Sequence, residues 1–534
     1  MKRLLLGATA LTLCAGFSGA AYADFTLNIL HINDFHARFG PITETDSNCD
    51  AEADAAGECF GGIARLKTAI EDKRAALEGQ NVVLLDAGDQ FQGSLYYTQY
   101  RSEIIAEFAN DLGIEVMAVG NHEFDDGPEE LAKLLDAVSF PIISGNTNVE
   151  NEPLLAGRIP GTHVLEIGGE KIGLVSALAE DTDETSSPGE NVVFEDTFTS
   201  LRAQVDALTA AGINKIIALT HVGYTQDLEI AANVPGIDVV VGGHSHTLLS
   251  NTDEKAAGPY PTLVNGPDGT EVPVVTAGAY AKYLGDLVVT WDDEGKLISA
   301  EGAPILMDAS VVPHEGYVTR LAELAKPLEA LMAQVIGTAT GPIDGSRETC
   351  RAVECQMGNL VADAMLDRVA DQGVTIAIQN GGGLRASIDA GEITMGEALT
   401  VLPFSNTLAT VELSGADVID ALENGVSDIE NAAGRFPQVA GLKYSYTLAK
   451  PAGERISDVM VGSGDTWAPI DEAATYTVVT NNYMRGGGDG YGTFAEGDNP
   501  YDFGPPLEQV LADYIAKQGG EYTPYTDGRI TVIE

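Results

Sequence analysis

The sequence predicts a protein of two α/β domains, and three observations lead to this fold class. In the first half of the 534-residue chain, short runs rich in valine, isoleucine and leucine alternate with longer stretches of helical periodicity. These runs are almost continuously apolar, which is typical of strands covered on both faces. After a further helical pattern, a second series of strands and helices follows. The chain is long enough for more than one domain, and 44% hydrophobic residues suffice for sizeable cores.

The first half predicts an α/β domain with a mainly parallel core. Its clearest helices are expected at residues 63–77 and 103–112. Its strands are expected at residues 25–32, 82–85, 116–119, 142–144, 172–175, 216–219 and 239–241. Ligand sites in such folds lie at the carboxyl ends of the strands. Residues that directly follow these strands are therefore candidate site residues.

The second half predicts a smaller domain of the α/β or α+β type. Helical patterns cover residues 358–369 and 415–425, and strands are expected at 376–378, 408–413, 442–448 and 476–480. The helical pattern between the halves is interrupted near Pro327. We therefore divide the mature chain into a first domain at residues 24–312, a connector helix at 313–336 and a second domain at 337–534.

Residues 1–23 have the three parts of a secretory signal peptide: a basic start, an apolar stretch and the small-residue end Ala21-Tyr22-Ala23. Cleavage is expected after Ala23. No other apolar run reaches the length of a membrane span, and the C-terminal residues are polar. The sequence thus predicts a periplasmic or secreted protein without a membrane anchor.

The charge balance excludes one class of partner. The chain has 29 basic and 80 acidic residues, a net charge of −51. Such a surface repels nucleic acid polymers and anionic membranes, so binding to either is not expected.

Four cysteines remain after removal of the leader, in two local pairs: Cys49 with Cys59, and Cys350 with Cys355. In an oxidising compartment each pair predicts a disulfide that closes a short loop. A metal site is the alternative, but the spacing is not that of a zinc ribbon, so disulfides are favoured.

Five short motifs place metal-binding residue types directly after apolar runs. They are N-D-F-H at 33–36, G-D-Q at 88–90, G-N-H-E-F-D at 120–125, T-H-V-G at 220–223 and G-H-S-H at 243–246, and they contain five of the eight histidines. Carboxylate, amide and imidazole ligands suit a pair of divalent ions that act in hydrolysis. The candidate ligands are Asp34, His36, Asp89, Asn121, His221, His244 and His246. Any one of them alone could be a turn residue or a core histidine, but the ordered set predicts a two-metal hydrolytic site.

His122 differs from the other motif histidines. It neighbours a candidate ligand and precedes Asp125 by three residues. An aspartate at this spacing can hold the tautomer of a histidine and favour its cation, as a general acid or an oxyanion stabiliser requires. We therefore predict that His122 and Asp125 are catalytic.

These motifs resemble the signature of calcineurin-like metallophosphoesterases, and the version here is most similar to the 5′-nucleotidase family. The resemblance implies a four-layer first domain joined by a helix to a C-terminal domain that provides substrate specificity. One metal ion would take Asp34, His36, Asp89 and His246, and the other would take Asp89, Asn121, His221 and His244. The ions are expected to be zinc, with manganese, cobalt and iron as alternatives, because nitrogen and oxygen ligands suit all four.

The second half contributes candidate substrate-binding residues. Asn380-Gly381-Gly382-Gly383-Leu384-Arg385 follows a predicted strand, so its glycines allow a ligand to approach the backbone and its arginine suits a phosphate. By itself this motif is a weak signal, since most such sequences are turns.

The resemblance extends to this half and assigns further roles. It implies that the aromatic rings of Phe404 and Tyr483 sandwich a base, that Asp489 contacts ribose hydroxyls and that Arg351 contacts phosphate. Position 483 carries tyrosine where the family often has phenylalanine. Phe404 as a core residue and Asp489 as a turn residue are the alternatives.

Together these observations predict an exported enzyme that hydrolyses the 5′-phosphate ester of nucleotides. UDP-sugars and nucleoside di- or triphosphates are further candidate substrates. A 2′,3′-cyclic-nucleotide 2′-phosphodiesterase with 3′-nucleotidase activity is the rival enzyme, and a periplasmic nucleotide-binding protein is the alternative that is not an enzyme.

Overall fold

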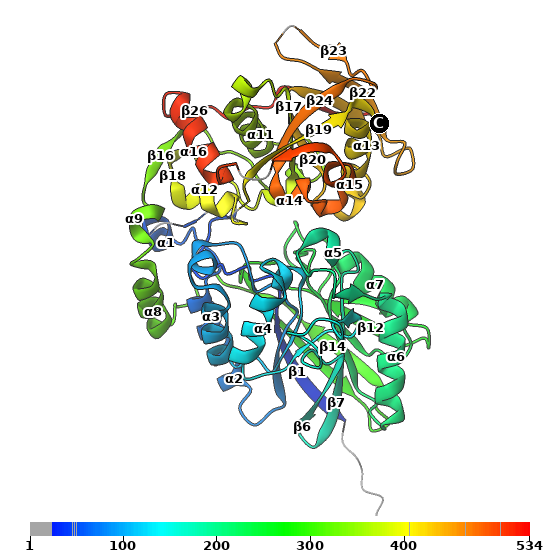
Figure 1. The fold of residues 1–534 in the computed structure, drawn as a ribbon. Coiled ribbons are helices and arrows are strands. Elements are labelled where there is room, and N and C mark those ends of the chain that lie inside the picture. The colour runs from blue at the N-terminus through cyan, green and yellow to red at the C-terminus, as the bar shows by residue number, and fades with distance from the viewer. Residues whose placement is uncertain are drawn as a thin grey trace, which may run out of the picture.

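The computed structural model describes residues 24–533, apart from residues 45, 47, 50, 405, 465, 502 and 503. The expected signal peptide, residues 1–23, lies outside the described residues. The N-terminal half forms the lower body in Figure 1 and the C-terminal half the upper one.

The N-terminal half contains two large sheets. The first has seven strands, which are β14 (Leu297–Gly302), β13 (Tyr283–Trp291), β1 (Phe25–Ile32), β2 (Val82–Asp86), β3 (Val116–Ala118) and β4 (Ile142–Ile143) in order, with β15 (Ile305–Leu306) paired to β13. Strands β1 to β4 run parallel, and β1 pairs with β13 in antiparallel fashion. The parallel core brings the ends of β1, β2 and β3 to one edge of the sheet.

The second sheet has six strands. In order they are β11 (Thr262–Asn265), β12 (Glu271–Val275), β10 (Val239–Val241), β9 (Ile216–His221), β7 (Glu170–Leu178) and β6 (Thr162–Ile167). Strands β7, β9, β10 and β12 are parallel neighbours. A separate short ladder joins β5 (Thr147–Asn148) to β8 (Val193–Phe194).

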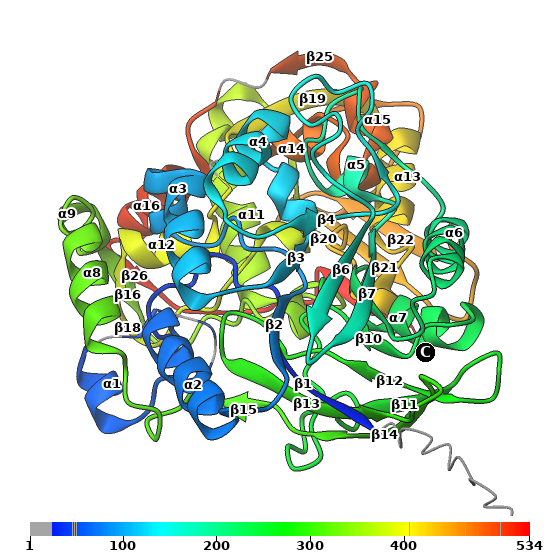
Figure 2. The same cartoon turned by 90° about the horizontal axis from the view of Figure 1, so that it is seen from below.

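Alternating side chains explain why the predicted strands are apolar throughout. Leu27 and Ile29 of β1 are buried in a core shared with the second sheet, whereas Leu30 and Ile32 are buried against helices. Helices α2 (Ile63–Ala76), α3 (Leu95–Leu112) and α4 (Gly127–Ala137) cover the first sheet, and α6 (Thr197–Ala210) and α7 (Tyr224–Asn233) cover the second. Figure 2 shows these two groups of helices on opposite sides of the paired sheets. The predicted four-layer first domain is confirmed.

The C-terminal half has three smaller sheets. A five-stranded sheet has the order β20 (Pro437–Ala440), β17 (Ile376–Asn380), β24 (Thr475–Asn481), β19 (Leu408–Ser414) and β25 (Asp498–Tyr501). A four-stranded sheet has the order β23 (Ala468–Pro469), β22 (Ile456–Val461), β21 (Leu442–Tyr446) and β27 (Ile530–Val532). The third sheet has the order β18 (Gly391–Thr394), β16 (Val335–Ala339) and β26 (Glu521–Tyr522).

Helices pack on both faces of the five-stranded sheet. One core joins this sheet to α11 (Gln356–Arg368), α12 (Met395–Val401) and α16 (Leu507–Lys517), and a second core joins it to α13 (Gly415–Gly425), α14 (Asn482–Arg485) and α15 (Gly492–Ala495). Outside the connector, the remaining helices of the described chain are α1 (Ala51–Ala56), α5 (Thr182–Thr185) and α10 (Arg347–Cys350), with 3₁₀ turns at Asn121–Phe124, Ala370–Gln372, Gly381–Gly383, Ile429–Asn431 and Gly488–Gly490. This half has the mixed α/β character that the sequence predicts.

The connector range 313–336 differs from a single helix. It contains α8 (Glu315–Ala325) and α9 (Glu329–Met332), and its last two residues already belong to β16. Pro327 lies between the two helices, where its missing N–H and its ring prevent a continuous helix.

In the part of the chain that the structure describes, no helix is both long and apolar enough to cross a bilayer.

Candidate active site

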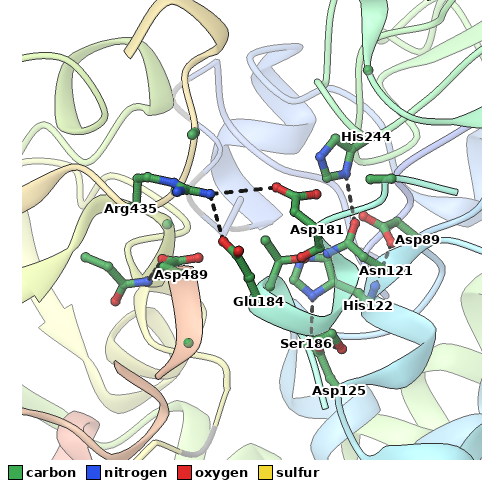
Figure 3. A pocket seen from close by; sticks show the side chains of 18 of the residues that line it. Asp89, Asn121, His122, Asp125, Asp181, Glu184, Ser186, His244, Arg435 and Asp489 are labelled. Carbon is green, nitrogen blue, oxygen red and sulfur yellow. Dashed lines mark hydrogen bonds and ion pairs between the residues drawn. The ribbon is translucent and has the colours of Figure 1, made fainter. Parts of the chain in front are cut away.

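A cavity of about 950 Å³ lies between the two halves of the molecule. Its floor comes from the carboxyl-terminal ends of strands in both N-terminal sheets, and its opposite wall comes from loops of the C-terminal half. Figure 3 shows the side chains on the two walls pointing toward one another. The cavity gathers residues that lie as far apart in the sequence as Asp89 and Asp489.

Five of the seven predicted metal ligands share an unusual backbone conformation. Positive φ angles occur at Asp34 (49°), His36 (50°), Asp89 (59°), His244 (75°) and His246 (55°). Residues other than glycine rarely adopt this region, and they cluster there at functional sites. The loops after the strands therefore hold these residues in a strained backbone conformation that is typical of a functional site.

The first predicted ligand group is close-packed and buried. Nε2 of His36 lies 3.0 Å from Nε2 of His246 and 3.7 Å from Oδ2 of Asp89. Nε2 of His246 lies 3.3 Å from Oδ1 of Asp34. Asp34 and His36 are almost completely buried. Four potential ligand atoms thus converge on one point.

The second group meets the first at Asp89. Its Oδ2 lies 3.0 Å from Nε2 of His221, and Nδ1 of His244 lies 2.8 Å from Oδ1 of Asn121. The ligand atoms of Asp89, His221 and His244 all lie within 4.8 Å of one another, as do those of Asp34, His36 and His246, and also those of His36, Asp89 and His122. The first two sets correspond to the two ligand groups that the family resemblance implied, and the third adds His122 beside them.

Hydrogen bonds to backbone carbonyls orient two of the imidazole rings. Nδ1 of His36 lies 3.2 Å from the carbonyl oxygen of Phe91, and Nδ1 of His221 lies 2.6 Å from that of Ala87. Each Nδ1 must donate its proton to the carbonyl, so the lone pair of each Nε2 is directed into the cluster. This is the arrangement that orients metal-ligating histidines.

The electrostatics also fit divalent cations. Burial raises the pKa of Asp34 to about 6. Burial also opposes a charge on His221, but Asp89 outweighs it and raises the pKa of His221 to about 10. Buried carboxylates that interact this strongly with nearby cationic groups favour positive charge at the cluster.

His122 and Asp125 form the expected pair. Nδ1 of His122 lies 2.6 Å from Oδ2 of Asp125, and the backbone N–H of His122 donates to Oδ1 of Asp89 at 2.9 Å. Burial would lower the pKa of His122, but Asp125 and Asp89 outweigh it and raise that pKa above its usual value. The hydroxyl of Ser186 donates to the other oxygen of Asp125 at 2.7 Å. The pair therefore favours an imidazolium whose Nε2–H is free to act on a ligand.

Two C-terminal residues reach across the cavity to this cluster. The ring of Phe404 stacks on that of His122, with centroids 5.7 Å apart and an interplanar angle of 19°. Nη2 of Arg385 lies 3.2 Å from Nε2 of His36, and its guanidinium lies 5.5 Å from the centre of the Phe404 ring. Both predicted substrate residues therefore lie beside the predicted metal cluster.

Three more predicted substrate residues form one hydrogen-bonded group. Nδ2 of Asn380 donates to Oδ2 of Asp489 at 2.6 Å, and the hydroxyl of Tyr483 lies 3.1 Å from Oδ1 of Asp489. Asn380 and Asp489 are buried, and all three residues line the cavity.

Arg351 and a residue that the sequence reasoning missed, Arg347, add positive charge to the same wall. Both line the cavity, on α10 and directly after it. Burial lowers the pKa of Arg347, and the like charge of Arg385 lowers it further. Burial also lowers the pKa of Arg351, and the charges of Arg347 and Arg385 add to this effect. Nε of Arg351 has no hydrogen-bond partner among the residues that the structure describes. Three adjacent guanidinium groups suit a phosphorylated ligand.

Both predicted cysteine pairs are joined as disulfides in the structure. The Cα atoms of Cys49 and Cys59 are 6.0 Å apart, and those of Cys350 and Cys355 are 5.1 Å apart. The second disulfide closes the loop that carries Arg351.

Comparison with known proteins decides the family. Residues 27–248 match the calcineurin-like phosphoesterase family, and residues 335–496 match the 5′-nucleotidase C-terminal domain. The chain is 38% identical to the 5′-nucleotidase of Diplobatis ommata over 98% of its own length and 93% of that protein. The chain belongs to the 5′-nucleotidase family. This family consists of metal-dependent phosphoric monoester hydrolases, so the chain is an enzyme of that class.

Further members of the 5′-nucleotidase family agree along the whole chain. The 5′-nucleotidase of Homo sapiens is 38% identical over 96% of this chain and 91% of that protein. The crystal structure of a 5′-nucleotidase precursor from Thermus thermophilus is similar with a TM-score of 0.90 and 41% identity, covering 96% of this chain and 100% of that one. Both halves, and not only the metal-binding half, therefore follow the 5′-nucleotidase family.

Besides Arg347, sequence reasoning missed Glu123, Glu184 and Arg435. Arg347 could have been found, because it lies four residues before Arg351 in a chain with few cations. Glu123 lies inside a recognised motif, but nothing in the motif shows that its carboxylate accepts backbone hydrogen bonds. Glu184 and Arg435, whose carboxylate and guanidinium lie 3.2 Å apart, come from different halves and have no local signal that would pair them.

Proposed function

We propose that this protein removes the 5′-phosphate from nucleotides to give a nucleoside and inorganic phosphate. The observation that carries the proposal is the shared cavity: one wall has the histidine and carboxylate cluster, and the facing wall has arginines, aromatic rings and Asp489. A phosphate next to the cluster would leave its nucleoside directed toward Tyr483 and Asp489. The 5′-nucleotidase relatives support the same substrate class.

We assign the cluster to two divalent metal ions. One is held by Asp34, His36, Asp89 and His246, and the other by Asp89, Asn121, His221 and His244. Zinc is our first expectation, with manganese, cobalt and iron as alternatives. When bound, such ions supply positive charge to the phosphoryl oxygens and lower the pKa of the attacking water.

The side chains of the protein orient the substrate and stabilise the charge that develops during the reaction. Arg351 and Arg385 bind the non-bridging phosphoryl oxygens, which surround the line of attack. Water attacks phosphorus and loses one proton as the new bond from oxygen to phosphorus forms. The bond from phosphorus to the 5′-oxygen breaks, and the departing alkoxide takes up a proton, so the products are the nucleoside and hydrogen phosphate. Protonated His122 stabilises the charge that develops on phosphoryl or alkoxide oxygen, while Asp125 holds its Nδ1–H.

The nucleoside site distinguishes nucleotides from other phosphate esters. The rings of Phe404 and Tyr483 stack on the base, and Asp489, held by Asn380, accepts hydrogen bonds from ribose hydroxyls. A buried acceptor that needs a hydrogen-bond donor discriminates strongly against substrates without a donor at that position.

A second activity, the cleavage of UDP-sugars or of nucleoside di- and triphosphates, is favoured by Arg347. Arg351 and Arg385 are assigned to the phosphate beside the cluster, and the cavity wall presents a third guanidinium group, that of Arg347. The third arginine would bind an additional phosphate.

We further propose that the enzyme is exported after cleavage at Ala23, and that it acts as a periplasmic or secreted protein. N-terminal sequencing of the protein purified from the medium or the periplasm should find Asp24 as the first residue. A protein that stays in the cytoplasm and still begins with Met1 would contradict export.

The substrate proposal is tested by measuring phosphate release in one dialysed preparation. AMP, UDP-glucose and 2′,3′-cyclic AMP are offered separately with added zinc, manganese or cobalt. Rapid release from AMP is expected. Release from 2′,3′-cyclic AMP alone would support the cyclic phosphodiesterase instead, and tight binding without release would support a binding protein.

A further inference from the structure

The one-turn helix α5 (Thr182–Thr185) connects the two walls of the cavity. It belongs to the N-terminal half and lies against the 3₁₀ turn Gly488–Gly490 of the C-terminal half. Figure 3 shows Glu184 of the helix beside Asp489 of the turn. The fit is tight, because a Cβ on Gly490 would lie 3.0 Å from Oε2 of Glu184 and 3.2 Å from Nη1 of Arg435. The turn therefore needs glycine here, also because its φ is +74°.

On the nucleoside side, α5 is bound by two side chains. Nη2 of Arg435 lies 3.2 Å from Oε2 of Glu184 and 3.9 Å from Oδ2 of Asp181. The hydroxyl of Tyr483 donates to the carbonyl oxygen of Glu184 at 2.6 Å. The Arg435 side chain is 15% exposed and the Glu184 side chain 44%, so this ion pair is partly open to water.

The same two side chains are connected to Asp489. The backbone N–H of Asp489 donates to the hydroxyl oxygen of Tyr483 at 3.1 Å. Nη1 of Arg435 donates to Oδ1 of Asn424, whose Nδ2 donates to the carbonyl oxygen of Asp489. The position of α5 thus depends on the proposed nucleoside-binding residues.

On the catalytic side, α5 ends directly at the catalytic pair. Ser186 follows the helix, and its hydroxyl donates to Oδ1 of Asp125 at 2.7 Å. Oδ2 of Asp125 lies 2.6 Å from Nδ1 of His122. Ser186 is buried, so this hydrogen bond has little competition from water. One residue separates Glu184 from Ser186, and Figure 3 shows both between Arg435 and His122.

We propose that residues 181–186 couple the nucleoside site to the catalytic pair, with Glu184, Ser186 and Arg435 as positioning residues. A nucleoside that orders Tyr483 and Asp489 fixes Glu184, and Ser186 then fixes the carboxylate that orients His122. This proposal rests on the proposed function, and it adds that the nucleoside raises kcat as well as binding. In this way binding energy from a part of the substrate that does not react is used at the reacting centre.

A purely structural ion pair predicts a different result. Partly exposed ion pairs contribute little to stability. If this pair were only structural, its removal would leave the turnover of both substrates unchanged, or would lower both equally by reducing the folded fraction. Coupling predicts a loss that depends on whether the substrate has a nucleoside.

The test compares AMP with glycerol 3-phosphate, a phosphate monoester whose leaving group is also an alkoxide but which has no nucleoside. The variants are Glu184→Gln, Arg435→Gln and their combination. Arg320→Gln is the matched control, because Arg320 makes a bidentate pair with Glu107 away from the cavity. Thermal unfolding checks that each variant is folded.

Each single substitution is expected to lower the ratio of kcat for AMP to kcat for glycerol 3-phosphate about five- to tenfold. The double variant should lose no more than the worse single variant, because both changes remove the same contact, and Arg320→Gln should keep the ratio. An unchanged ratio in Glu184→Gln and Arg435→Gln, or losses that multiply in the double variant, would overturn the coupling.

Ser186 gives an independent arm. Ser186→Ala is expected to lower kcat for both substrates with little change in KM, because the lost hydrogen bond is to Asp125, and Ser186→Thr should restore it. If Ser186→Ala keeps its full kcat, the catalytic end of the coupling is wrong. If the unaltered protein releases no phosphate from AMP, the proposed function fails; if it does so and the ratios stay constant, only the coupling fails.

Discussion

The imidazole of His122 and the ring of Phe404 stack across the cavity, with centroids 5.7 Å apart. His122 comes from the half that matches the calcineurin-like phosphoesterase family, and Phe404 from the half that matches the 5′-nucleotidase C-terminal domain and carries the proposed nucleoside-binding residues. This contact brings the proposed acid of the reaction directly beside the proposed base clamp.

Removal of the Phe404 ring should weaken nucleotide binding more than it weakens the reaction. Stacking of a base on an aromatic ring contributes about 1–3 kcal/mol. We expect Phe404→Leu to raise KM for AMP by about tenfold or more on this basis. Phe404→Tyr keeps the ring and serves as the control. Steady-state kinetics with AMP decides the point, and an unaltered KM in Phe404→Leu would remove this residue from the base clamp.

Loss of the His122 imidazole should lower turnover without loss of metal. General acid–base catalysis contributes about 10²–10⁴-fold, so His122→Ala should lower kcat for AMP by a factor in that range. Metal content, measured by plasma mass spectrometry, should equal that of the unaltered protein, since we assign His122 no ligand role. A variant that keeps its turnover would contradict the catalytic assignment.

Removal of the metal ions should destabilise the fold. The cluster contains the buried carboxylates of Asp34 and Asp89 beside buried imidazoles, and bound cations compensate their charge. Metal that binds only the folded state stabilises it by about 4 kcal/mol at a thousand times its dissociation constant. Chelation should therefore lower the melting temperature, and zinc should restore it. A melting temperature that changes neither on chelation nor on addition of zinc would count against a metal site here.

Glu123 should prove essential for the shape of the cluster. Its buried carboxylate accepts backbone N–H groups of Asp89, Gln90, Phe91 and Gly120 at 2.7–3.2 Å, and it thereby joins the loops after β2 and β3. Glu123→Gln turns an amide NH₂ toward these donors, so we expect a loss of about 1–3 kcal/mol of unfolding free energy and weaker metal binding.

Denaturant titration and zinc titration measure these two effects. Glu129→Gln, at a side chain that is 75% exposed, is the control and should change neither. Wild-type metal affinity in Glu123→Gln would show that the loops hold their shape without this carboxylate.

His31 should make stability depend on pH. Burial lowers the pKa of His31 in the folded protein to about 3, and within the described part of the chain its Nδ1 has no hydrogen-bond partner. In the unfolded chain the pKa is about 6.5. The contribution of neutral His31 is therefore complete above pH ~6.5, and it is lost as the pH falls toward 3, by about 1.4 kcal/mol per pH unit.

His31→Gln cannot titrate, so its unfolding free energy should fall less steeply between pH 6 and pH 5 than that of the unaltered protein. Parallel slopes in the two proteins would mean that His31 does not carry this dependence.

The strands and ligands could be predicted because their signals are local. β1 and β10 have the predicted bounds, since strands buried on both faces are apolar at every position. The candidate ligands were found because histidine and aspartate directly after such strands have few structural reasons to occur together.

Other elements lack such a local signal. β11 and β14 have several exposed residues and take part in antiparallel ladders, so they have no continuous apolar run. The predicted helix at 103–112 is the part of α3 that follows a kink at Arg101, whose φ of 53° is not helical; the part of α3 from Leu95 up to the kink was not predicted. The contact between Glu184 and Arg435 depends on how the two halves meet, and no property of either residue in a highly charged chain predicts it.

The central claim is that the metal cluster and the facing wall hydrolyse nucleotide monophosphates. The most direct measurement is the release of adenosine and phosphate from AMP by the dialysed protein before and after zinc is added. We expect adenosine and phosphate to form in equal amounts, at a rate that zinc raises strongly. Zinc-loaded protein that binds AMP but releases neither product would contradict it.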